Sequence, residues 1–170
     1  MNRNLFITVL IIFNIAIDQI SKAIVRGTMV KGGKGQINVI KDYFQLIWVE
    51  NKGAFLGMGS DMNPTLKLIF LLVLPTIVLG YVIYYIVKTK ELDRLSLIAF
   101  CCIIGGGVAN VFDRIVYKQV TDFFFIDLGG VFKTGIFNVA DLSVTTGMIM
   151  LLFSGIFGNK KKVASEAGNA

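Results

Sequence analysis

The chain has 170 residues, of which 55% are hydrophobic and 16% are charged, and its formal net charge is +6. Soluble domains contain about 25% charged residues, so this composition excludes an ordinary soluble protein and predicts an integral membrane protein. Membrane topology accounts for the positive charge, and we expect no nucleic-acid partner. The sequence has no histidine, and its two cysteines are the neighbours Cys101 and Cys102. We therefore expect no metal, no cofactor and no catalysis that depends on histidine.

Four apolar segments predict four membrane-spanning helices within a single domain, residues 1–162. A helix needs about 20 residues to cross a hydrocarbon core about 30 Å thick. The middle two segments qualify through long charge-free runs, and the outer two qualify with polar residues at their ends. The expected helices are residues 4–25, 64–88, 94–113 and 137–158. The predicted fold class is therefore a membrane all-α bundle, followed by a disordered tail at residues 163–170.

The first segment shares a short basic start and an apolar run with cleavable signal peptides. Asn14 and Asp18 interrupt that run, and no clear small-x-small cleavage site follows it, so we expect a retained helix. Asp18 and Lys22 are four residues apart and share one face of this helix. They could form an ion pair that eases the exit from the membrane, or a polar base that supports a site.

Basic residues indicate the orientation of the predicted bundle. Arg3, the short loop with Lys88, Lys90 and Arg94, and the run Lys160–Lys162 all fall on one side. Short basic flanks mark the cytoplasmic side, so both termini are expected in the cytoplasm. The segment between the first two helices is also basic, but longer segments count less in this rule.

Residues 36–60 predict a small β-sheet, or cradle, on the outer face of the membrane. Alternation at 36–39 and the aromatic and β-branched run Tyr43–Val49 favour short strands. Three glycines between residues 53 and 59 favour a mobile flap at Ala54–Met62, although a simple turn has the same composition. Asn63 and Pro64 then form a helix start, because asparagine caps helices and proline suits the first helical position.

Polar residues gather at the outer end of the third predicted helix. Gly106, Asn110, Asp113 and Arg114 share one stripe on that helix. A polar stripe in a membrane must face protein or water, so it indicates either a functional site or a structural network.

Aspartates occur at the outer end of the last helix and in the loop before it. Asp141 lies at the start of the final apolar segment, where a charge is costly unless it caps the helix or performs a function. Two aspartates that share a partly buried site hold one proton between them. The charged carboxylate can then take a proton from water and the neutral one can donate to a carbonyl oxygen. Asparagines and Arg114 would orient the carboxylates and stabilise developing negative charge.

The sequence offers two candidates for the partner of Asp141. Asp113 is on a rigid helix but can be neutralised by the adjacent Arg114 or by backbone groups, and we give it a structural role. Asp122 is predicted to lie in a loop that can fold back, and we favour it as the partner. A small membrane transporter or proton-relay subunit is the alternative function, although its acids would be expected at several depths.

Five sequence motifs make the chain closely similar to bacterial lipoprotein signal peptidases, also called signal peptidase II. They occur in the order found in that family, and Thr121 replaces a residue that is commonly aliphatic. The motifs are Asp18-Gln19-x-x-Lys22, Asn51-x-Gly53-Ala54-Phe55, Gly107-x-x-Asn110-x-x-Asp113-Arg114, Val120-x-Asp122-Phe123 and Phe137-Asn138-x-Ala140-Asp141.

This resemblance implies an aspartyl endopeptidase of the bacterial inner membrane, active as a monomer near the outer face and a target of globomycin. Its partners would be membrane lipids and a diacylglyceryl-modified prolipoprotein, which it would cut just before the lipid-modified cysteine. The resemblance places the catalytic pair on Asp122 and Asp141. The residues expected to line or brace the site are Asp18, Lys22, Asn51, Gly53, Asn110, Asp113, Arg114, Asn138 and Ala140.

Overall fold

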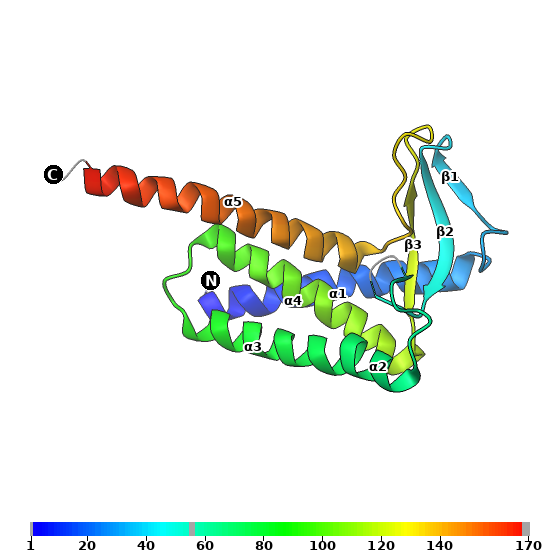
Figure 1. Cartoon of the computed structure of the whole chain (residues 1–170), viewed down its shortest axis with the longest axis horizontal. Helices are drawn as coiled ribbons and strands as arrows, with labels where there is room; N and C mark the ends of the chain where they lie inside the picture. The colour runs from blue at the N-terminus through cyan, green and yellow to red at the C-terminus, as the bar shows by residue number, and fades with distance from the viewer. Residues whose placement is uncertain (1, 55–56, 168–170) are drawn as a thin grey trace.

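The computed structural model describes residues 2–54 and 57–167, with side-chain surroundings as far as Gly155. Figure 1 shows a long helical bundle with a small sheet at one end, while the chain termini and the α3–α4 turn lie toward the other end. The elements are α1 (Arg3–Thr28), β1 (Ile37–Ile40), β2 (Phe44–Asn51), α2 (Pro64–Leu68), η2 (Ile69–Val73), α3 (Leu74–Lys88), α4 (Arg94–Tyr117), β3 (Val120–Ile126) and α5 (Val139–Ala167).

The predicted membrane bundle with a small sheet is confirmed. Within the described residues, three helical segments are long and apolar enough to span a membrane: Arg3–Thr28, Pro64–Lys88 and Arg94–Tyr117. The first part of α5, Val139–Gly155, is a shorter apolar helix. The second segment matches its predicted range, residues 64–88, and it comprises α2, η2 and α3 in succession.

The other helices extend beyond the predicted ends. α1 continues to Thr28 instead of residue 25, and α4 continues to Tyr117 instead of residue 113. Charged residues mark where a helix leaves hydrocarbon, whereas the helical hydrogen bonds can continue into water. α5 starts at Val139 and continues to Ala167, beyond the predicted end at 158 and into the predicted tail. Residues 168–170 lie outside the described part of the chain.

Helix α4 is the centre of the bundle, since it packs against α1, α3 and α5. Small residues allow its close approach to α5. A methyl group added at Gly106 would collide with the carbonyl oxygen of Ala140, and one at Gly147 would lie 2.5 Å from the carbonyl oxygen of Ala99. This tight packing holds the polar stripe of α4 against the first turn of α5.

The sheet is antiparallel with the order β1-β2-β3. Its third strand corrects the sequence prediction, because Asp122 lies in β3 and not in a loop. Strand β3 is rich in β-branched and aromatic residues, but it pairs with β2, which is distant in the sequence. In this register Asn51 is opposite Val120, and Asp122 is therefore a diagonal neighbour of Asn51.

Candidate active site

Asp141 belongs to a reciprocal capping arrangement at the start of α5. The side-chain oxygen of Asn138 accepts a hydrogen bond from the Asp141 N–H at 2.9 Å. In return the Asn138 N–H donates to Asp141 Oδ2 at 3.2 Å. This is the capping-box geometry, and the positive end of the helix dipole favours an anion there. Capping uses only one carboxylate oxygen, and the other, Oδ1, accepts from Asn110 Nδ2 at 2.9 Å.

Asp122 is held by two amide groups and is 2% exposed. Asn138 Nδ2 donates to Asp122 Oδ1 at 2.6 Å, and Asn51 Nδ2 donates to Asp122 Oδ2 at 2.9 Å. Burial raises the pKa of Asp122 to about 6, although the hydrogen bond from Asn51 opposes this change. Asn138 therefore bonds to both carboxylates, and the structure brings Asp122 and Asp141 together around it.

A second group of carboxylates surrounds the buried ammonium of Lys22. Lys22 Nζ lies 2.8 Å from Asp18 Oδ2 and 2.9 Å from Asp113 Oδ2, and all three side chains are fully buried. Its remaining hydrogen bond goes to Asn110 Oδ1 at 2.9 Å. The predicted pairing of Asp18 with Lys22 is confirmed. The countercharge of Asp113 comes from Lys22 of α1 and not from Arg114, whereas the predicted contact of Asp113 with a backbone group is present.

Each carboxylate of this group also fixes the backbone of another element. Asp18 Oδ1 accepts from the Ala140 N–H at 2.8 Å, which ties α1 to the start of α5. Asp113 Oδ2 accepts from the Thr121 N–H at 3.4 Å, which ties α4 to β3. The Lys22 group thus positions the two elements that carry Asp141 and Asp122.

Arg114 connects α4 to the turn that follows β2. Its guanidinium donates to the carbonyl oxygens of Asn110 at 3.2 Å and Gly53 at 3.0 Å. The Gly53 N–H donates to Asn51 Oδ1 at 2.8 Å. A Cβ at Gly53 would lie 2.5 Å from the carbonyl oxygen of Met58, so this turn requires glycine.

Two cavities approach the aspartates from different sides. The larger, about 680 Å³, has Asp141, Asn110 and Arg114 at its polar end, and otherwise apolar walls formed mainly by η2, α4 and α5. The other, about 410 Å³, reaches Asp122 along β2. Its lining residues are Val49, Glu50, Asn51, Lys52, Gly57, Ser60, Asp122, Gly135 and Ile136.

Described residues of the predicted flap, Ala54–Met62, line both cavities. Ala54 lines the larger cavity, whereas Gly57 and Ser60 line the smaller one. Residues 57–62 form turns, and residues 55–56 lie outside the described part of the chain. Across residues 2–54 and 57–167 no group of three or more His, Cys, Asp or Glu side chains is placed to hold a metal ion.

Sequence reasoning gave no role to two residues that support the site. Gln19 donates to Asp18 Oδ2 at 3.2 Å and to Asp113 Oδ1 at 3.0 Å. Thr121 accepts a hydrogen bond from Arg26 Nη1 at its hydroxyl at 3.0 Å, in addition to its backbone bond with Asp113. Gln19 belongs to the motif Asp18-Gln19-x-x-Lys22, and Thr121 directly precedes Asp122, but neither observation indicated these hydrogen bonds.

Comparisons with known proteins agree on one group of relatives. A family model described as Signal peptidase (SPase) II matches residues 10–157. A lipoprotein signal peptidase from Clostridium novyi is 36% identical over 142 residues, which cover 84% of this chain and 91% of the relative. A lipoprotein signal peptidase from Pelodictyon phaeoclathratiforme is 36% identical over 158 residues, which cover 89% of this chain and 88% of the relative. A solved bacterial membrane enzyme matches with a TM-score of 0.80 at 25% identity, covering 92% of this chain and 91% of that one.

Proposed function

We propose that this chain, which belongs to the signal peptidase II family, is an aspartyl endopeptidase that removes signal peptides from diacylglyceryl-modified prolipoproteins. It would cut the peptide bond just before the lipid-modified cysteine. One observation carries the aspartyl assignment. At one end of the membrane bundle, Asn138 donates hydrogen bonds to the carboxylates of both Asp122 and Asp141.

The two aspartates differ in their place in the fold, because Asp122 lies in strand β3 and Asp141 lies in the first turn of α5. Asp122 is buried and its pKa is raised to about 6, so it is the residue that would hold the shared proton. Asp141 accepts from the Asn110 side chain and from the backbone N–H of Asn138, just before α5, and these donors favour a carboxylate. We therefore assign Asp141 as the general base and Asp122 as the general acid.

Hydrolysis then needs no covalent intermediate. Asp141 takes a proton from a water molecule as the water oxygen attacks the scissile carbonyl carbon, and Asp122 gives its proton to the carbonyl oxygen. The resulting gem-diol collapses when Asp141 passes its proton to the leaving nitrogen and Asp122 recovers a proton from a gem-diol hydroxyl. Asn51, Asn110 and Asn138 keep the carboxylate oxygens oriented throughout.

The larger cavity supports a path for the signal peptide. From the polar end at Asp141 it continues along apolar residues of the membrane segments, including Phe70, Met148 and Leu152. These three side chains are exposed and would face lipid in a bilayer. A signal helix in the bilayer could therefore enter sideways and present its scissile bond to Asp141.

We also propose a topology for the inner membrane. The basic flanks at Arg3 and Lys88–Arg94 would be cytoplasmic, with both termini inside and the aspartates near the outer face. The segment Ala54–Met62 would act as a flap that moves so that one peptide can reach both carboxylates. Hydrogen exchange of this segment should slow when globomycin binds, and unchanged exchange would exclude the flap.

A cleavage assay tests the function directly. Purified protein in a neutral bilayer should cleave a diacylglyceryl-modified prolipoprotein but not the same precursor without the lipid. Asp141→Asn should reduce turnover by at least about a thousandfold, because it removes the general base. Asp127→Asn is the matched control, since Asp127 pairs with Lys133 outside the site. Equal cleavage by Asp141→Asn and Asp127→Asn would overturn the assignment.

A further inference from the structure

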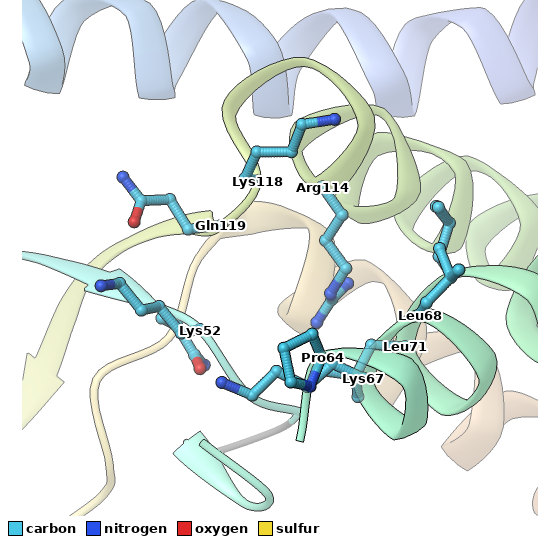
Figure 2. A pocket seen from close by; sticks show the side chains of 10 residues that line it. Lys52, Pro64, Lys67, Leu68, Leu71, Arg114, Lys118 and Gln119 are labelled. Carbon is cyan, nitrogen blue, oxygen red and sulfur yellow. The ribbon is translucent and has the colours of Figure 1, made fainter. Parts of the chain in front are cut away.

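A third pocket, of about 300 Å³, lies between the start of the Pro64–Lys88 segment and the end of α4. Figure 2 shows Arg114 reaching from α4 toward Pro64 and Lys67, with Lys52 and Gln119 on the other side. Four basic residues line this pocket, Lys52, Lys67, Arg114 and Lys118, and no acidic residue does. The peptidase mechanism uses none of the three lysines.

The three lysines of this pocket form no ion pair within the described residues, whereas Arg114 interacts electrostatically with Asp141, Asp122 and Asp113. Arg114 and Lys118 donate only to backbone carbonyl oxygens. Positive charges around one pocket repel each other, so an anion bound in the pocket would be attracted by all of them.

One wall of the pocket is apolar and continues onto the membrane surface. Leu68 and Leu71 line the pocket. Leu68, Ile69 and Phe70 are 53%, 43% and 49% exposed. The pocket lies at the start of a helical segment apolar enough to span a membrane, and thus at the depth of lipid headgroups. A pocket with cationic side chains beside exposed apolar side chains is suited to a ligand whose phosphate group is joined to acyl chains.

We propose that this pocket binds the headgroup of an anionic glycerophospholipid from the membrane leaflet that surrounds it. The phosphate would lie between Arg114 and Lys67, with Lys52 at the rim, and the acyl chains would follow the exposed face of α2 and η2. Guanidinium and ammonium groups both bind phosphate, and nearby basic residues strengthen binding to anionic lipid. A free phosphate ion or an acidic peptide would leave the apolar wall without a function.

This inference goes beyond the proposed peptidase function. The diacylglyceryl group of the proposed substrate carries no phosphate, so the basic pocket does not match it. Arg114, Asn51 and Lys52 are nevertheless shared between this pocket and the cavities that reach the aspartates. A bound lipid would lie beside the Arg114 guanidinium, which already fixes the turn at Gly53.

Lipid binding can be measured without any substrate, so the result does not depend on peptidase activity. The full chain in neutral detergent is titrated with dioleoylphosphatidylglycerol or dioleoylphosphatidylcholine, and bound lipid is counted by native mass spectrometry. The test variant is Lys52→Gln with Lys67→Gln. The matched control is Lys34→Gln with Lys41→Gln, which removes the same charge from the same region but outside the pocket. Thermal unfolding of each variant verifies that it is folded.

We expect the unmodified chain to prefer phosphatidylglycerol, and the Lys52/Lys67 variant to lose at least about tenfold in affinity for it. The Lys34/Lys41 control should keep the original affinity. Equal binding of the two lipids, or equal losses in both variants, would overturn the proposal. Inorganic phosphate or hexaglutamate serves as competitor. Displacement of phosphatidylglycerol by either one at equal concentration would overturn the choice of a lipid.

Discussion

Two pairs of aspartates lie at the sheet end of the bundle, and they differ in what separates their carboxylates. Asp18 and Asp113 share the ammonium of Lys22 and are fully buried with it. Asp122 and Asp141 share the neutral side chain and backbone of Asn138, and each lines a cavity. A lysine between two carboxylates supplies a countercharge, whereas a shared amide supplies none and leaves room for a proton. The first pair is therefore suited to structure and the second to proton transfer.

The sharpest test of this comparison is to replace one carboxyl group in each pair. Asp122→Asn should reduce cleavage by at least about a thousandfold while the protein stays folded, because the proton donor is lost. Asp113→Asn should keep cleavage within about tenfold at a temperature where it is folded, but should lower the unfolding temperature. Turnover of the lipid-modified precursor and thermal unfolding are measured for both variants. Near-normal turnover by Asp122→Asn, with loss in Asp113→Asn, would reverse the roles of the two pairs.

Replacing Lys22 should have the largest effect on stability. Lys22→Met leaves two buried carboxylates without their cation, and breaking a buried ion pair costs about 3–5 kcal/mol. Thermal unfolding in detergent should show a large decrease in the unfolding temperature, and the triple variant with Asp18→Asn and Asp113→Asn should recover part of it. Lys34→Met, at an exposed turn, is the control for the same substitution. Equal unfolding temperatures for the two lysine variants would mean that the group around Lys22 does not hold the fold.

Local features of this molecule could be predicted from sequence, and contacts between distant segments could not. Charge-free runs located the membrane helices because the cost of burying charge acts on each segment separately. The pairing of Asp18 with Lys22 followed from spacing on one helix. The contact between Lys22 and Asp113 needs α1 and α4 side by side, and the strand character of β3 needs β2, so neither was visible in a local pattern. The match of five motifs to a family named side chains that the structure brings together around Asn138 and Lys22, which local physics left open.

Asn138 should be the most sensitive of the uncharged residues, because it serves both carboxylates. Asn138→Ala removes the amide that donates to Asp122 and the oxygen that caps α5 at Asp141. We expect a decrease in turnover of about 10–100-fold, and a loss of about 1 kcal/mol in stability from the missing cap. Asn38→Ala, in the exposed strand β1, is the control. If Asn138→Ala lowered stability but left turnover unchanged, Asn138 would serve only as a helix cap.

The pH dependence should show the smallest but most specific difference between the pairs. The pKa of Asp122 is raised from 3.8 to about 6 by burial, so the folded protein holds this proton at pH values where the unfolded chain loses it. The stabilisation is fully present below about pH 3.8 and is lost as the pH rises through about 6. The catalytic proton leaves over the same range, so kcat/KM for the free enzyme should fall as the pH rises past about 6.

Replacing Asn51 should change the pH above which kcat/KM falls. Its hydrogen bond lowers the pKa of Asp122, so Asn51→Ala should move the alkaline fall in kcat/KM to higher pH, besides lowering its maximum. Gln19→Ala, which removes hydrogen bonds to Asp18 and Asp113, should leave the midpoint in place. Both profiles are measured with the same lipid-modified precursor. A midpoint that moves with Gln19 and not with Asn51 would assign the titrating proton to the Lys22 group, and the two pairs of aspartates would no longer be separable by function.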